Sequence, residues 1–150
     1  MIEEICKKAK AASKQLAQLS DEQKNRTLCL MADSLEESTP KILEENQKDV
    51  KEARAKGIKE ALIDRLVLGQ KRVDSMANDL RGLTKLVDPV NEIVKTWTRP
   101  NGLIIGQMRV PLGVIGIIYE SRPNVTSEAS GLCIKAGNAI ILRGGSDAIR

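Results

Sequence analysis

The chain has 150 residues, of which 41% are hydrophobic and 29% are charged, and its net charge is +4 at neutral pH. This composition predicts one hydrophobic core and argues against a disordered tail or a membrane protein. Basic and acidic residues alternate through residues 41–65, and Trp97 and Tyr119 are the only aromatic residues. We therefore expect no nucleic-acid partner. The chain has no histidine, which excludes Ser-His and Cys-His pairs and histidine metal sites. We predict no bound metal.

The three cysteines, Cys6, Cys29 and Cys133, are far apart in the sequence and odd in number. This pattern predicts neither a disulfide framework nor a metal-binding knuckle, and it is typical of a reducing compartment. The first residues include acidic side chains and no apolar signal segment, and the apolar stretch 110–119 is too short to span a membrane. We expect a cytoplasmic protein without membrane contact.

Apolar residues at helical spacing predict a series of helices in the first half of the chain. The first stripe includes Ile2, Ile5 and Cys6, and Ser20-Asp-Glu-Gln23 is a capping box that begins the next helix. Thr39 and Pro40 predict an N-cap and first turn, and Gly57 predicts the end of that helix. Further stripes include Leu28, Met31, Ala32 and Leu35, and then Val73, Met76, Ala77, Leu80, Leu83 and Val87 before Asp88-Pro89.

Residues 93–110 predict a β-hairpin. Ile93–Arg99 and Leu103–Val110 are rich in β-formers and flank Pro100-Asn-Gly102, which is a turn sequence. Apolar residues occur in both phases of both strands, so the hairpin needs cover on both faces. It is therefore either part of a core or an arm laid against another subunit, and the sequence favours neither.

Residues 113–150 predict a βαβ unit, the arrangement in which parallel strands place ligands at their carboxyl ends. Val114–Tyr119 shows no polar alternation, which is typical of a strand buried on both faces. Asn124 is the expected cap of a helix that ends at Gly137, and Asn138–Leu142 is the expected second strand. Ser146 or Asp147 is expected to cap a further helix.

Two polar segments follow these strands. Residues 119–124 form either a binding site or a capped corner in which Glu120 pairs with Arg122. Arg143-Gly-Gly-Ser146 provides backbone N–H groups and a cation for a phosphate, but it is also ordinary turn sequence. All three cysteines lie on apolar helical stripes, and we predict that they pack in the core and are inert.

Val110–Thr126 together with Gly137–Ser146 resembles the γ-glutamyl phosphate reductases, a branch of the aldehyde dehydrogenase superfamily. The resemblance extends to Ile42–Asn46, Asp64–Leu66, Asp88–Val90 and Arg99–Gly102. It implies an α/β fold with N-terminal helices, the opening βαβ part of a Rossmann-like cofactor domain and a β-hairpin oligomerisation arm. The expected divisions are a helical part at 1–90, the arm at 91–112 and the start of the Rossmann-like core at 113–150.

The resemblance also implies NADPH-dependent reduction of L-glutamyl 5-phosphate to L-glutamate 5-semialdehyde and phosphate, in proline biosynthesis. Its catalytic cysteine lies in a later domain with no match here, so we expect an inactive N-terminal portion. The partners it implies are copies of the chain itself, in a homo-oligomer, and glutamate 5-kinase as a candidate. A non-catalytic binding or assembly module is the alternative. The resemblance gives Asn124 as an oxyanion donor, Arg122 as a substrate ligand, and as cofactor-binding residues Glu120, Ser121, Arg143, Gly144, Gly145 and Ser146.

Overall fold

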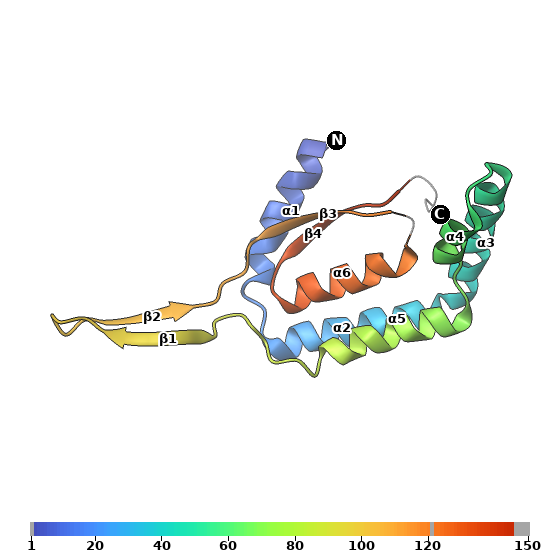
Figure 1. Cartoon of the computed structure of the whole chain (residues 1–150). Coiled ribbons are helices and arrows are strands. Elements are labelled where there is room, and N and C mark those ends of the chain that lie inside the picture. Colours follow the sequence, from blue (N-terminus) through green and yellow to red (C-terminus); the bar gives the residue numbers. More distant parts are fainter. Residues whose placement is uncertain (1, 121, 146–150) are drawn as a thin grey trace.

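The structure is a computed structural model that describes residues 2–120 and 122–145. Its helices are α1 (Ile2–Leu16), α2 (Asp21–Glu37), α3 (Thr39–Ala55), α4 (Glu60–Leu66), α5 (Gln70–Leu83) and α6 (Pro123–Lys135). Its strands are β1 (Ile93–Thr98), β2 (Ile104–Met108), β3 (Val114–Ile118) and β4 (Ala139–Arg143). Figure 1 shows α6 on one face of the β3–β4 pair and α1 crossing the other, with the β1–β2 hairpin projecting from the body. The predicted fold class is confirmed.

The main core lies where α2, α5 and α6 meet. Leu28 and Ala32 of α2 pack with Ala77 and Leu80 of α5, and these side chains are at most 1% exposed. Gly131 brings α6 onto this pair, because an added Cβ would lie 2.5 Å from a Leu80 methyl carbon and 2.8 Å from one of Leu83. The missing side chain of Gly131 therefore sets how closely the third helix approaches.

A second, smaller core joins α3 to α4. Ala53 of α3 packs against Ile63 and Leu66 of α4, and all three are at most 2% exposed. The two clusters are separate. The α3–α4 pair, at the right of Figure 1, is thus a unit with its own packing beside the main body.

Local signals predicted some helix ends correctly and others not. The Ser20–Gln23 capping box is confirmed, as are Gly57 and Gly137 in the left-handed conformation after α3 and α6. The Thr39 cap is wrong, because Ser38 is the N-cap and the Thr39 hydroxyl donates to the Leu35 carbonyl. The Asn124 cap is also wrong, because Pro123 begins α6 and Arg122 precedes it as the N-cap.

The strands β3 and β4 are parallel, in register from Val114 opposite Ala139 to Ile118 opposite Arg143. Asn138 fixes their starting ends, since its Oδ1 accepts from the Gly113 N–H at 2.8 Å and its Nδ2 donates to the Ala136 carbonyl at 3.1 Å. The expectation that β3 is buried on both faces is wrong for the described chain, because Ile118 is 86% exposed. The described chain leaves the carboxyl end of β3 uncovered, because only α1 and α6 lie against the β3–β4 pair.

The cysteines divide between core and surface. Cys133 of α6 is buried, as predicted, and burial raises the pKa of its thiol. Cys6 and Cys29 are exposed, so their assignment to the core is wrong. Both lie within helices, as the periodicity predicts, but nothing in the described chain covers these positions.

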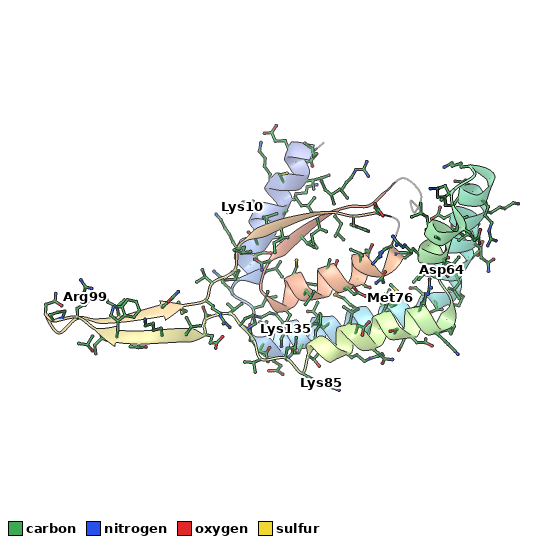
Figure 2. All side chains as sticks on the ribbon, in the orientation of Figure 1. Lys10, Asp64, Met76, Lys85, Arg99 and Lys135 are labelled. Carbon is green, nitrogen blue, oxygen red and sulfur yellow. The ribbon has the colours of Figure 1, made fainter. Side chains whose placement is uncertain are left out.

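Two buried lysines tie distant segments to α2. Lys24 is fully buried and its Nζ lies 2.5 Å from Asp88 Oδ2, in the segment that leads to the hairpin. Lys135 at the end of α6 donates to Asp21 Oδ1 at 2.6 Å and to Asn25 Oδ1 at 2.7 Å; it is labelled in Figure 2. The hydrogen bond from Lys135 lowers the pKa of the Asp21 carboxyl below its ordinary value of 3.8. Both ammonium groups therefore have partners despite their burial.

The hairpin pairs β1 with β2 in antiparallel register, with an irregularity between Ile93 and Lys95. Its residues are almost all exposed, including Ile93 at 63%, Ile104 at 69% and Met108 at 50%. Figure 2 labels Arg99 at the far tip. The hairpin is therefore not part of the core of the described chain, which was one of its two expected positions. In the same described residues every helix is too short or too polar to cross a bilayer.

Candidate functional site

A groove of about 710 Å³ lies beyond the carboxyl ends of β3 and β4. The body contributes α2, α5 and α6 to its walls, and α3 together with Leu68, which follows α4, closes the other side. Apolar side chains form much of the lining, and charged and hydroxyl groups are set among them. The main lining residues are Leu30, Met31, Leu35, Lys41, Ile42, Glu45, Asn46, Asp49, Leu68, Met76, Tyr119, Glu120, Arg122, Thr126, Ser130, Gly144 and Gly145. Such a groove has the size and mixed lining of a small-molecule site.

Four predicted site residues meet in this groove. Glu120 and Arg122 reach it from the corner after β3, and Gly144 and Gly145 reach it from the end of β4. They come together because parallel strands end at the same edge of a sheet. Ser121 and Ser146, predicted with them, lie outside the described residues, as does the cap expected at Ser146 or Asp147.

Tyr119 links the two strand ends. Its hydroxyl lies 2.6 Å from the Thr126 hydroxyl on α6, and its ring lies against Gly144. A Cβ at Gly144 would be 3.5 Å from the ring, which is an ordinary van der Waals distance. Tyr119 thus forms a fixed surface between the corner and the glycine pair, although sequence reasoning singled it out only as one of the corner's polar residues.

Arg143 lies at the end of β4 and is exposed. Its guanidinium donates to the carbonyl of Gly144, which keeps the cation close to the glycine pair. The side chain does not itself line the groove, but it lies beside one rim of it. An anion held over the glycines would therefore have this cation as its neighbour.

Asn124 faces a different hollow. Together with Arg122 and Pro123 it lines a polar cleft of about 300 Å³ between α6 and the α4–α5 side of the molecule. Its Nδ2 donates to Glu128 Oε1 at 2.8 Å. The corner thus separates the cleft from the groove, and Arg122 borders both. In the described residues Glu120 and Arg122 form no side-chain ion pair; the Arg122 N–H donates to the Glu120 carbonyl at 2.8 Å.

Asn46 was not predicted as a site residue. It is 7% exposed in the middle of α3 and lines the groove. Its Nδ2 donates to the Leu66 carbonyl at 2.9 Å, and its Oδ1 accepts from the Leu68 N–H at 2.8 Å. One signal was present in the sequence: an asparagine within a helix is neutral to unfavourable unless its amide has a specific partner.

The described residues contain no group of three His, Cys, Asp or Glu side chains able to hold a metal ion. The cysteines, all three of them described, line neither the groove nor the cleft. Cys133 has a raised thiol pKa, which is the opposite of what a nucleophilic thiolate requires. The polar groups of the site are therefore backbone N–H groups, hydroxyls, amides and fixed charges, set among apolar side chains.

No protein-family model matches the chain. Individual relatives do, over almost all of it. A γ-glutamyl phosphate reductase of Carboxydothermus hydrogenoformans is 61% identical over 144 residues, which is 96% of this chain and 35% of that protein. One of Thermoanaerobacter sp. is 60% identical over 148 residues, 99% of this chain and 36% of that protein. The chain resembles the γ-glutamyl phosphate reductases. It spans about a third of the length of these curated relatives.

Solved γ-glutamyl phosphate reductases have the same fold over this region. The crystal structure from Thermotoga maritima matches with a TM-score of 0.91 and 48% identity, over 95% of this chain and 34% of that one. The structure from Saccharomyces cerevisiae matches with a TM-score of 0.92 and 32% identity, over 97% of this chain and 37% of that one. The correspondence is with the N-terminal region of such a reductase.

Proposed function

We propose that this chain is the N-terminal portion of a cytoplasmic, NADPH-dependent reductase that converts L-glutamyl 5-phosphate to L-glutamate 5-semialdehyde and phosphate. The observation that carries the proposal is the groove at the carboxyl ends of β3 and β4, where Glu120, Arg122, Gly144 and Gly145 meet. The similarity to γ-glutamyl phosphate reductases supports this choice of activity. The same similarity supports a place in proline biosynthesis, with glutamate 5-kinase as the candidate partner.

The residues present fit one end of a dinucleotide. Gly144 and Gly145 let backbone N–H groups approach an anion, and Tyr119 offers a flat surface beside them. Arg143 supplies the cation that a 2′-phosphate requires, which favours NADPH over NADH. When bound, the cofactor supplies the hydride. Glu120, Gly144, Gly145 and Arg143 are the described residues that we propose hold it, with Ser121 and Ser146 beside them in the sequence.

The substrate carries a carboxylate and a phosphate, and Arg122 is the cation that borders both hollows. We propose that Arg122 binds one of these anionic groups. Asn124 is the proposed amide donor to the oxygen that gains negative charge during acyl transfer. One of the two N–H groups of its Nδ2 donates to Glu128, and the second is the one that we propose donates to the substrate. None of the chain's cysteines lies beside these groups, so the thiol that attacks the acyl phosphate must come from another segment.

The hairpin supports the proposal of a homo-oligomer. Its exposed apolar residues occur on both faces, and a second subunit would provide the cover that the described chain lacks. The alternative of a non-catalytic assembly module rests on the same feature. It predicts self-association without binding in the groove.

The decisive experiment measures the affinity of the complete protein for NADPH and for NADH, with Arg143→Ala as the variant. Loss of a charge-assisted contact to the 2′-phosphate should weaken NADPH binding by about tenfold to a hundredfold and leave NADH binding unchanged. Arg99→Ala at the hairpin tip is the matched control, since it removes the same side chain far from the groove (Figure 2).

Two results would contradict the proposal at different levels. Unchanged NADPH affinity in Arg143→Ala removes that residue from the cofactor site. A complete protein that fails to oxidise NADPH when L-glutamyl 5-phosphate is supplied rules out the proposed activity, and self-association alone would then favour the assembly module.

A further inference from the structure

Asn46 joins two elements through both atoms of its amide. The residue lies on α3, and its two partners, the Leu66 carbonyl and the Leu68 N–H, lie at and just beyond the end of α4. The distances of 2.9 Å and 2.8 Å are those of good hydrogen bonds. The amide thus pairs with the chain as a neighbouring strand would. One side chain fixes the register of the segment after α4 against α3.

This clamp determines where one wall of the groove stands. Asn46 lines the groove itself, and Leu68, held by its N–H, lines both the groove and the polar cleft. Met76 of α5, labelled in Figure 2, and Pro123 of α6 also border both hollows. A shift of the segment 66–68 would therefore change the shape of both hollows at once.

The rest of the α3–α4 unit does not depend on the clamp. Ala53, Ile63 and Leu66 form their own apolar cluster. Arg72 holds the outer side of the same segment, because its guanidinium donates to the carbonyls of Asp64 at 2.7 Å and Val67 at 2.5 Å. Without the Asn46 amide the unit should remain folded. The Leu68 N–H, left without that acceptor, would turn toward water or another acceptor and carry the Leu68 side chain with it.

We infer that Asn46 is a positioning residue that sets the fit of the groove to its ligand through Leu68. The inference rests on the proposed function, in that the ligands tested are those of the proposed reductase. It adds a role for the α3–α4 unit, for which the sequence alone predicts no site residue. The unit contributes one wall of the groove, and the Asn46 side chain, not packing in the core, holds that wall in place.

The test compares Asn46→Ala with Asn138→Ala in the complete protein. Asn138 is the matched control: it is 4% exposed and also bonds two backbone groups, at the amino ends of β3 and β4, away from the groove. For each variant the measurements are the thermal unfolding midpoint, the Kd for NADPH, and kcat and KM for L-glutamyl 5-phosphate.

Asn46→Ala should raise the Kd for NADPH or the KM for L-glutamyl 5-phosphate about tenfold or more, because small misplacements of a binding wall are costly. Asn138→Ala should lower the unfolding midpoint and leave both constants within about twofold of wild type, since fewer folded molecules change the apparent kcat and not KM. Asn46→Asp keeps an acceptor for the Leu68 N–H but sets a carboxylate oxygen against the Leu66 carbonyl, and it should give a rise of at least the same size.

The inference is overturned if both ligand constants of Asn46→Ala stay within about twofold of wild type, whether or not its unfolding midpoint falls. If Asn46→Ala does not fold, unchanged constants in Asn46→Asp overturn it equally. Failure of the proposed function looks different, because the wild-type protein itself would then neither bind NADPH nor reduce the acyl phosphate.

Discussion

The helical body and the β1–β2 hairpin carry similar apolar side chains but differ in what covers them. In the body, Leu28, Val73 and Leu80 are at most 1% exposed, because α2, α5 and α6 cover one another. In the hairpin, Ile93 and Ile104 are more than half exposed, and the described part of the chain places no layer against either face of the two strands. The body therefore draws its stability from the chain itself. The hairpin's apolar surface can contribute only where residues outside the described chain, from the same protein or from another subunit, cover it.

The two regions meet at the base of the hairpin, where both connecting segments are bonded to the body. Lys24 holds Asp88 before β1, and Asn138 holds Gly113 at the start of β3. Pro111 and Val90 pack beside Gly137, where a Cβ would come within 3.0 Å and 3.3 Å of them. The hairpin is thus anchored at its base although its length lies open to solvent.

The largest loss in the free energy of unfolding is expected at the base of the hairpin. Asp88→Ala leaves the Lys24 ammonium fully buried without its partner, which should lower the free energy of unfolding by about 3–5 kcal/mol in urea. Lys24→Met should cost less, because the Asp88 side chain is 18% exposed and its Oδ1 still accepts from the Val90 N–H. Equal losses in the two variants would show that burial of Lys24 is not the controlling factor.

Within the body, Gly131→Ala should be destabilising by about 1–3 kcal/mol, since its methyl group would overlap Leu80 and Leu83 in a packed core. Gly82→Ala in α5 is the matched control. It meets nothing within 4 Å and should be stabilising by about 0.5–1 kcal/mol through helix propensity. Chemical unfolding of both variants tests this, and a neutral Gly131→Ala would mean that α6 can move away without cost.

The smallest effect on folding is expected in the hairpin. Trp97 is 37% exposed, with Lys95 Nζ 5.6 Å from its ring centre, so Trp97→Arg should change the free energy of unfolding of one subunit by no more than about 0.5 kcal/mol. The same change should reduce the oligomer mass measured by light scattering. Thr96→Arg, an exposed site on the other face of β1, is the comparison. An unchanged mass in both variants excludes the hairpin as the assembly surface.

Most of the correct predictions about the fold came from short sequence motifs at helix ends. The capping box at Ser20 and the glycines after α3 and α6 act within a few residues, and the structure has them where the sequence indicates. The exposure of Cys6 and Cys29 could not be predicted, because periodicity identifies a helix face but not what lies against it. Gly131 was missed for the same reason. A glycine in a helix signals weak propensity until the neighbouring helix is known.

The site was predicted in part for a related reason. Topology alone places Glu120, Arg122, Gly144 and Gly145 at one edge, because parallel strands end together. The far wall of the groove comes from α3 and from Leu68 after α4, and no period in the sequence reveals that these residues lie opposite the strand ends. Asn124 was predicted at the same site but lines the neighbouring cleft, because its position on the first turn of α6 determines which hollow its side chain faces.

The position of α6 has a consequence for how the protein is made. Lys135 contacts Asp21 and Asn25 across 114 and 110 residues of sequence, and Gly131 completes the packing on α2 and α5. A growing chain in which α2 and α5 have paired therefore still exposes the apolar surface that α6 covers, until residues 123–135 have left the ribosome. That interval is when aggregation and chaperone binding compete with folding. The pace of translation between α5 and α6 thus bears on the yield of native protein.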